Sequence, residues 1–169
     1  MKILPRVAIL LVLLSTTFAH AQEAGETEDA RTKNVIGLFV GALSNLETNE
    51  TGPAIGVDYT REVHEKLGIV ASAEWASAGE REAAFGGGLE VKPGGGFKLV
   101  LADGIILERT DEEDGSSSRE AEFVFRTGFG YELEVSGVPL VPTINFDIVN
   151  TEDGVDLHLV YGLSVEIPF

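Results

Sequence analysis

Beyond residue 33, polar and apolar residues alternate in runs that are separated by turn-forming residues. A period of two is typical of β-strands with two different faces, whereas an amphipathic helix repeats every 3.6 residues. The pattern therefore predicts an all-β chain. We place eight strands, at Asn34–Leu46, Pro53–Val63, Leu67–Ala76, Ala83–Lys92, Phe97–Arg109, Glu122–Val135, Leu140–Asn150 and Val155–Phe169.

The last run shows the alternation most clearly. Its odd positions, from Val155 to Phe169, are all apolar or aromatic, while the even positions include Asp156, His158 and Glu166. A slip of one residue would move every one of these side chains to the wrong face, so the register is strongly specified.

The predicted connections alternate in length. Three are short, at 64–66, 93–96 and 136–139. The other four are longer on average and rich in acid: Glu47–Gly52, Ser77–Glu82, Thr110–Ala121 and Thr151–Gly154. Short turns at one end and longer loops at the other are typical of an outer-membrane up-and-down β-barrel. An even number of strands places both termini at the short-turn end, which is periplasmic in such barrels.

The aromatic residues indicate which face meets lipid. Eleven of them fall on the apolar faces of the predicted strands: Tyr59, Trp75, Phe85, Phe97, Phe123, Phe125, Phe129, Tyr131, Phe146, Tyr161 and Phe169. The interior of an eight-stranded barrel is only just wide enough to be filled by side chains. We therefore predict that these rings point outward into hydrocarbon. A soluble lipocalin-type barrel, with its apolar face inward around a ligand, is the alternative.

Two details stay open in the sequence. Asp103 falls on the outward face near the middle of its strand, unless Asp103-Gly104 forms a β-bulge that shifts the alternation. In the first strand either of two sets can face lipid: Ile36, Leu38, Val40 and Ala42, or Val35, Phe39 and Leu43.

The opposite face of the strands is predicted to fill the barrel with charged side chains: Asp58, Glu62, Glu74, Glu90, Lys92, Lys98, Glu108, Arg126, Glu132, Asp147, His158 and Glu166. Turn lengths place Glu90 opposite Lys98, and His158 opposite or diagonal to Asp147, with Arg126 one strand away from Asp147. A His-Asp pair is one interpretation, as in barrel enzymes that trim lipid A. The sequence favours a self-satisfied ion network, because no serine stands beside His158 and Ser164 lies six residues along the strand. We assign no catalytic, cofactor-binding or metal-binding residue.

The N-terminus resembles a secretory signal peptide over residues 1–21, with Lys2 and Arg6 before an apolar run and Ala19-His20-Ala21 as the cleavage site. Residues 22–33 are polar and are predicted to form a flexible periplasmic leader, followed by the barrel over 34–169. Without the signal, 10 basic residues oppose 28 acidic ones, a net charge of −18, which argues against a nucleic-acid partner. There is no cysteine. The acidic run 111–114 could hold Ca²⁺ or bridge lipopolysaccharide, although a solvated loop is the usual meaning of such a run.

Taken together, the signal peptide, the Gly-aromatic segment Gly128–Tyr131 and the alternating last strand ending in Phe169 resemble the OmpA/OmpX-like superfamily of small eight-stranded outer-membrane β-barrels. Pro168 departs from the polar residue usual there. The resemblance implies a monomeric integral protein of the bacterial outer membrane, with no cofactor, in contact with membrane lipid and lipopolysaccharide. It also implies that the barrel-assembly machinery reads Tyr161–Phe169.

The expected function is non-enzymatic, either structural or through loop-mediated interactions. Large pores are not expected, because an open channel needs about 16 strands. The alternatives are a lipid-modifying barrel enzyme that uses His158 and Asp147, and a soluble lipocalin-like periplasmic carrier.

Overall fold

The computed structural model describes residues 34–78, 80–111, 117–151 and 154–169. The described residues contain no helix that is long and apolar enough to cross a membrane. The predicted signal peptide and leader, and residues 112–114 of the acidic run, lie outside them. The strands are β1 (Asn34–Asn45), β2 (Thr51–His64), β3 (Leu67–Ala78), β4 (Glu80–Gly94), β5 (Phe97–Asp111), β6 (Ser117–Tyr131), β7 (Leu133–Val135), β8 (Val138–Asn150) and β9 (Val155–Pro168).

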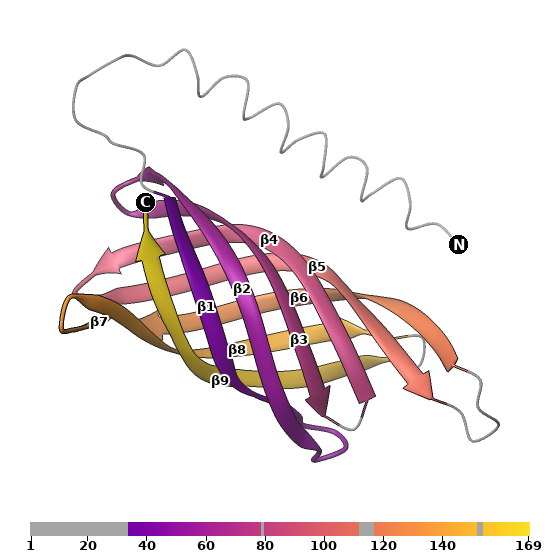
Figure 1. Cartoon of the computed structure of the whole chain (residues 1–169). Helices are drawn as coiled ribbons and strands as arrows, with labels where there is room; N and C mark the ends of the chain where they lie inside the picture. The colour runs from indigo at the N-terminus through magenta and orange to yellow at the C-terminus, as the bar shows by residue number, and fades with distance from the viewer. Residues whose placement is uncertain (1–33, 79, 112–116, 152–153) are drawn as a thin grey trace, which may run out of the picture. The chain divides into compact units, whose positions relative to one another are not determined.

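Antiparallel pairing closes these strands into a barrel (Figure 1). From β1 to β6 each strand pairs with the next, and β8 pairs with both β7 and β9. Because β1 also pairs with β9 and β6 with β8, the sheet has no free edge along most of its length. The short β7 follows β6 after Glu132 and also pairs with β8, so it continues the same barrel strand. The predicted eight-stranded antiparallel up-and-down barrel is confirmed.

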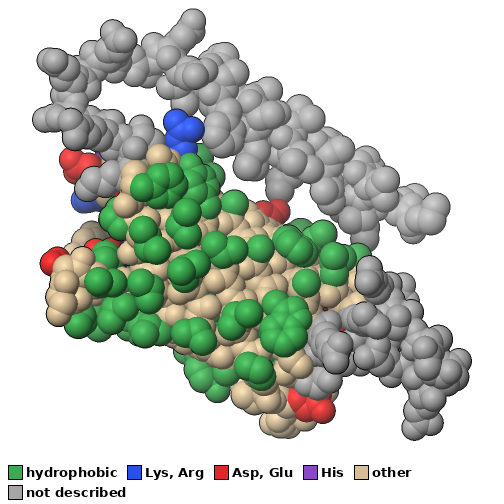
Figure 2. All heavy atoms as spheres, in the orientation of Figure 1, with side chains coloured by type: hydrophobic (Ala, Val, Ile, Leu, Met, Phe, Trp, Pro, Cys, Tyr) green, Lys and Arg blue, Asp and Glu red, His purple; other side chains and the backbone are tan. Residues whose placement is uncertain are grey.

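The outer surface of the barrel is apolar. All eleven aromatic residues predicted to face outward are exposed, from 40% for Tyr131 to 66% for Phe169. Figure 2 shows apolar side chains spread over one face of the barrel, with charged groups toward its ends. Because the rings lie outside, the inward-facing apolar lining of a lipocalin is not present in the described strands.

The exposure of the side chains shows which residues of the first strand face outward. Leu38 and Val40 are exposed, at 49% and 60%, whereas Val35 and Leu43 are buried. Phe39 points inward and packs against the apolar cluster around Leu43. Its ring lies over the backbone of two glycines, Gly41 and Gly162, where an added Cβ would come within 2.6 and 2.7 Å of ring atoms. The missing side chains of these glycines make the room that lets an aromatic ring enter the barrel.

The β-bulge that the sequence left open at Asp103-Gly104 is not formed. The pairing of β4 with β5 runs without a shift through Gly87↔Asp103 and Gly86↔Gly104, and its only irregularity lies between Val91 and Gly94. Gly86 and Gly104 face each other with their backbones in close approach, which lets the two strands keep regular pairing here. Asp103 therefore stays on the outward face, between the exposed Leu101 and Ile105.

The predicted loops are partly strand. Pairs Ser77↔Arg81 and Ala78↔Glu80 extend the β3–β4 hairpin through most of the expected loop at 77–82. Pairing of β5 with β6 likewise reaches Asp111↔Ser117 within the expected loop at 110–121. Polar residues mark where lipid contact ends, but backbone hydrogen bonds between strands continue as long as the register allows. The sequence pattern therefore placed these strand ends too early.

Candidate functional site

The charged residues predicted to face inward lie in the lumen of the barrel, and Arg126 is the centre of one group. Its Nε and Nη2 donate to the two carboxylate oxygens of Asp147 at 2.7 and 2.6 Å. Its Nη1 and Nη2 donate to Glu74 at 3.2 Å each. We call these three residues the Arg126 clamp. Arg126 stands directly opposite Asp147, which is one of the two predicted positions, direct or diagonal. Its contact with Glu74 crosses the lumen from β6 to β3 and was not predicted.

A second group surrounds Lys98, which is only 5% exposed. Its Nζ donates to both carboxylate oxygens of Glu166 at 2.5 Å and lies 3.0 Å from Glu132. Asp58 and Glu90 also interact electrostatically with this ammonium and with the Glu166 carboxylate. We call these five residues the Lys98 cluster.

Lys92 lies beside this cluster. It pairs with Glu62 of β2, two strands away, and its Nζ lies 3.5 Å from Oε1 of Glu90. The predicted placement of Glu90 directly opposite Lys98 is wrong, because Glu90 pairs with Val100. The shift arises next to the turn at Gly94, Gly95 and Gly96, whose positive φ angles of 120°, 65° and 84° suit glycine.

His158 stands opposite Asp147 across β9 and β8, as one of the two predicted geometries required. Its ring does not engage that carboxylate, whose two oxygens accept hydrogen bonds from Arg126. Instead, His158 Nε2 lies 3.3 Å from Asn45 Nδ2, and Nδ1 lies 3.7 Å from Glu82 Oε2. A catalytic histidine needs an orienting acid and a nucleophile in hydrogen-bond reach. Within the described strands, His158 makes no hydrogen bond with a serine, threonine or other nucleophile.

Sequence reasoning missed Asn45 and Glu82 as members of the His158 group. Asn45 is the last residue of β1, and Glu82 was expected in a loop. Extending the alternation of β4 backward from Ala84 would have placed Glu82 inward, which is where it is found, 5% exposed.

A cavity of about 100 Å³ lies between these groups. Its charged lining consists of Asp58, Glu74, Glu90, Glu166, Lys98 and Arg126. In the part of the chain that the structure describes, no three acidic or histidine side chains gather as metal ligands. The ion pairs span the lumen from strand to strand and leave this hollow rather than a wide channel.

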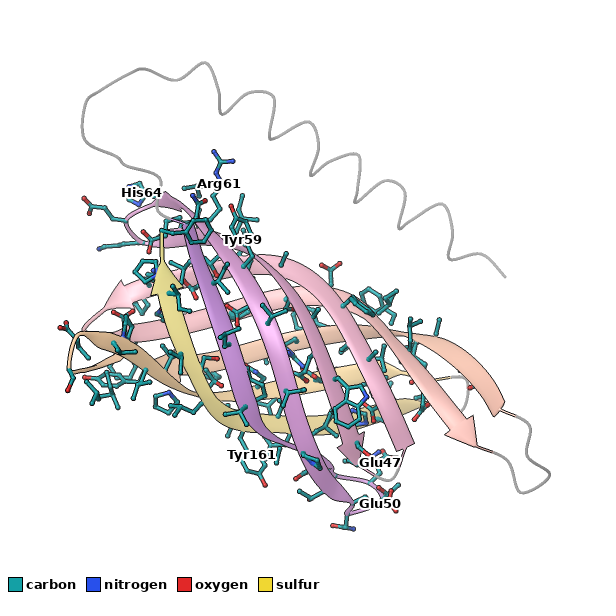
Figure 3. The ribbon with its side chains drawn as sticks, in the orientation of Figure 1. Glu47, Glu50, Tyr59, Arg61, His64 and Tyr161 are labelled. Carbon is teal, nitrogen blue, oxygen red and sulfur yellow. The ribbon has the colours of Figure 1, made fainter. Side chains whose placement is uncertain are left out.

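The two ends of the barrel differ in their side chains. At the end that carries the C-terminus, Tyr59 donates its hydroxyl to Asn34 at 2.8 Å, and Arg61 and His64 lie nearby (Figure 3). There the backbone of Phe169 is hydrogen-bonded in both directions to Asn34, which ties the C-terminal residue into the closing pair of strands. Glu47 and Glu50 lie at the opposite end. The long stem of the outward Arg61 allows its guanidinium to reach a polar boundary from the apolar belt.

Comparisons with solved structures agree with this architecture, although no protein-family model and no curated protein sequence matches the chain. The chain is similar to Ail, the attachment invasion locus protein of Yersinia pestis, at 10% identity and a TM-score of 0.56, over 80% of this chain and 99% of that one. It is similar to Neisserial surface protein A at 14% identity and a TM-score of 0.58, over 81% and 97% of the two chains.

The N-terminal β-barrel domain of Pseudomonas aeruginosa OprF gives 11% identity and a TM-score of 0.53, over 80% and 98%. The fold is that of a small outer-membrane barrel. At these identities the likeness extends to the fold and not to what these proteins bind.

Proposed function

We propose that this protein is an integral protein of a bacterial outer membrane that acts through its loops or as a structural component of the envelope, without enzymatic activity. The observation that carries the proposal is the distribution of side chains over the two faces of one closed sheet. Large apolar residues cover the outside, and ion pairs fill the inside. An outside this apolar is stable in hydrocarbon and not in water.

The filled lumen supports a barrel without a large pore. Arg126 and Lys98 each bridge distant strands of the barrel through carboxylates, β6 to β3 and β5 to β9, and Lys92 bridges β4 to β2. Opening a path for solutes would require these pairs to separate inside an eight-stranded barrel, which has little interior space. In planar bilayers we expect no stable conductance of the size seen for 16-stranded porins.

The partners and orientation follow from the same proposal. The apolar belt contacts membrane lipid, and the loops at the end of Glu47 and Glu50 face lipopolysaccharide and the exterior. Both termini then lie on the periplasmic side, and the barrel-assembly machinery reads the strand that ends in Phe169. We expect a monomer, because closure of the barrel uses the edges of β1 and β9 within one chain.

A lipid-modifying activity receives less support. It would use His158 and Asp147, but the Asp147 carboxylate is occupied by Arg126 and the imidazole faces Asn45 and Glu82. A His158→Ala variant should therefore leave the lipid A of an expressing strain unchanged relative to wild type, as measured by mass spectrometry. A modification that depends on His158 would establish the enzyme instead.

Fractionation of cells and electrophoresis test the main proposal. The protein should sediment with outer membranes, require detergent for extraction, and migrate differently before and after boiling, since closed barrels resist dodecyl sulfate until heated. Recovery as a water-soluble monomer in the periplasmic fraction would contradict the proposal and restore the carrier interpretation.

A further inference from the structure

Three arginines form one row across β4, β5 and β6, at the end of the barrel that carries Glu47 and Glu50. Strand pairing sets Arg81 of β4 directly opposite Arg109 of β5, and Arg109 directly opposite Arg119 of β6. The three strands lie side by side (Figure 1). Neighbouring strands are about 4.8 Å apart, so the row spans about 10 Å of the barrel wall. The register of the sheet therefore brings three cationic residues together at one place.

The row belongs to the outward side of the sheet. Residues two positions apart lie on the same face of a strand. Each arginine is in phase with an exposed apolar residue of its own strand, which is Phe85 on β4, Leu107 on β5 and Phe123 on β6. The next row toward the middle of the barrel is apolar and consists of Ala83, Leu107 and Ala121. The arginines therefore occupy the positions at which the apolar belt ends.

Acidic residues at the same level belong to the other side of the sheet. The adjoining row is Glu82, Glu108 and Glu120, which the alternation places in the inward phase. Glu82 is accordingly only 5% exposed. Among the described outward positions beyond the arginines on these three strands, Asp111 is the one acidic residue. A chain with a net charge of −16 thus collects positive charge at one outward place.

The rest of this boundary lacks such charge. Neutral residues hold the corresponding outward positions on β1, β2, β8 and β9: Ser44, Thr51, Asn150 and Val155. The sequence from residue 34 onward has five further cationic residues. Lys92, Lys98 and Arg126 lie in the lumen, whereas Arg61 and Lys66 belong to the opposite end of the barrel. The positive row is therefore confined to one side of one rim.

This arrangement favours a bound anion. Like charges directly opposite each other in a sheet destabilise the pairing, so three arginines in register are costly unless an anion lies among them. A guanidinium group donates from a rigid fork that matches the oxygens of phosphate. Phosphate is also the anionic group that lipid headgroups present at a membrane boundary. The apolar rows next to the arginines would contact the acyl chains of the same lipid.

We propose that Arg81, Arg109 and Arg119 form a binding site for a phosphorylated lipid of the outer leaflet, with its phosphates at the arginines and its acyl chains along the apolar rows of β4 to β6. Lipid A, which carries two phosphates on a disaccharide, has this chemistry. The proposal rests on the proposed envelope function and deepens it, because it assigns contact with lipopolysaccharide to three residues on one side of the barrel.

Two lipids that differ only in phosphate test the chemistry on the wild-type protein. The folded barrel in non-ionic detergent is mixed with equal amounts of lipid A and of lipid A from which both phosphates have been removed, and native mass spectrometry measures the ratio of the two complexes. Each basic residue at an anionic membrane surface contributes about a fivefold gain in affinity, so lipid A should bind about a hundredfold more tightly. Equal binding would overturn the proposal. Displacement of lipid A by millimolar inorganic phosphate would overturn the assignment to a lipid and indicate a site for free phosphate.

Variants test the location of the site. The triple variant R81Q/R109Q/R119Q should bind the two lipids equally, whereas Arg61→Gln, the same change at the opposite rim, should keep the wild-type ratio. Lysine at the three positions should retain part of the preference, because it keeps the charge and loses the fork. Heat-modifiable migration shows that each variant is folded. A folded triple variant with the wild-type ratio, or an equal loss in Arg61→Gln, would overturn the proposal. The comparison on the wild-type protein does not depend on the folding of any variant.

Failure of this site and failure of the proposed function give different results. A protein that fractionates with outer membranes and is heat-modifiable, but shows no preference for phosphorylated lipid, would keep the envelope function and overturn the site. Recovery as a water-soluble periplasmic protein would overturn both.

Discussion

The Arg126 clamp and the Lys98 cluster solve the same problem in the same lumen in different ways. Both place cations among an excess of carboxylates. Arg126 uses its planar guanidinium to donate to four carboxylate oxygens, so both of its acidic partners are satisfied. Lys98 is a point charge with three donors that bonds both oxygens of Glu166, and Oε1 of Glu90 has only a longer, 3.5 Å ion pair with Lys92.

The number of charges therefore does not by itself decide how many polar atoms of a buried network form hydrogen bonds. An arginine fork matches the geometry of carboxylates, whereas an ammonium group concentrates its bonds on one partner. The clamp accordingly works as a rigid cross-brace between β3, β6 and β8. The Lys98 cluster lines a polar cavity in which carboxylates outnumber cationic side chains.

The largest effect should follow from removing the cation of the clamp. Arg126→Ala leaves Glu74 and Asp147 buried without compensation, and breaking a buried ion pair in this way costs about 3–5 kcal/mol. Urea unfolding of the barrel in lipid vesicles, followed by the tryptophan fluorescence of Trp75, should show a decrease of this size in the free energy of unfolding. Arg61→Ala, which removes the same side chain from the rim of the barrel, is the control and should change stability by less than about 0.5 kcal/mol. Equal effects of the two variants would mean that the clamp does not brace the fold.

The clamp also shows how far the sequence can be interpreted. The period of two predicted the outward rings and the inward charges, and it brought Arg126 next to Asp147, because neighbours across a hairpin follow from the register. It could not predict that Arg126 also binds Glu74. Contacts across a lumen depend on the stagger of the strands, which accumulates around the barrel. Shifts in register, such as the one on β4 between Val91 and Gly94, change that stagger.

The positions of residues near the ends of strands were not predicted correctly for another reason. Glu82 is polar and lies next to a turn, so it was expected in a loop, yet it belongs to β4 and lies beside His158. Asn45 was expected at the end of the first strand, but it was not assigned to the lumen, where it contacts His158. Conversely, the costly outward position of Asp103 suggested a bulge that the structure does not contain. Sequence patterns measure the average environment of a strand and are least informative where one residue departs from it.

A matched pair of carboxylate variants should separate the two groups most directly. In Glu74→Gln the guanidinium loses an ionised partner, and hydrogen bonds to charged groups contribute about 1.5–3 kcal/mol, so stability should fall by that amount. In Glu90→Gln stability should stay equal or rise, because the substitution removes a negative charge from a cluster that already has an excess. Urea titrations of both variants under one buffer test this contrast. A loss in Glu90→Gln as large as in Glu74→Gln would show that the Lys98 cluster is as well satisfied as the clamp.

The smallest of the three expected changes in stability concerns Asp103 on the outer face. Cationic side chains neutralise the acids of the lumen, but none is paired with Asp103 among the described residues. Asp103 lies between Leu101 and Ile105 on β5, and the described residues donate no hydrogen bond to its side chain. A carboxylate in hydrocarbon is destabilising by less than the value for a basic residue at midplane, so Asp103→Leu should increase the free energy of unfolding by about 1–2 kcal/mol in vesicles. The gain should shrink in short-chain detergent, where water reaches the middle of the belt. Stability that decreases in vesicles would contradict contact between this face and lipid and would indicate instead that Asp103 has a partner in the membrane.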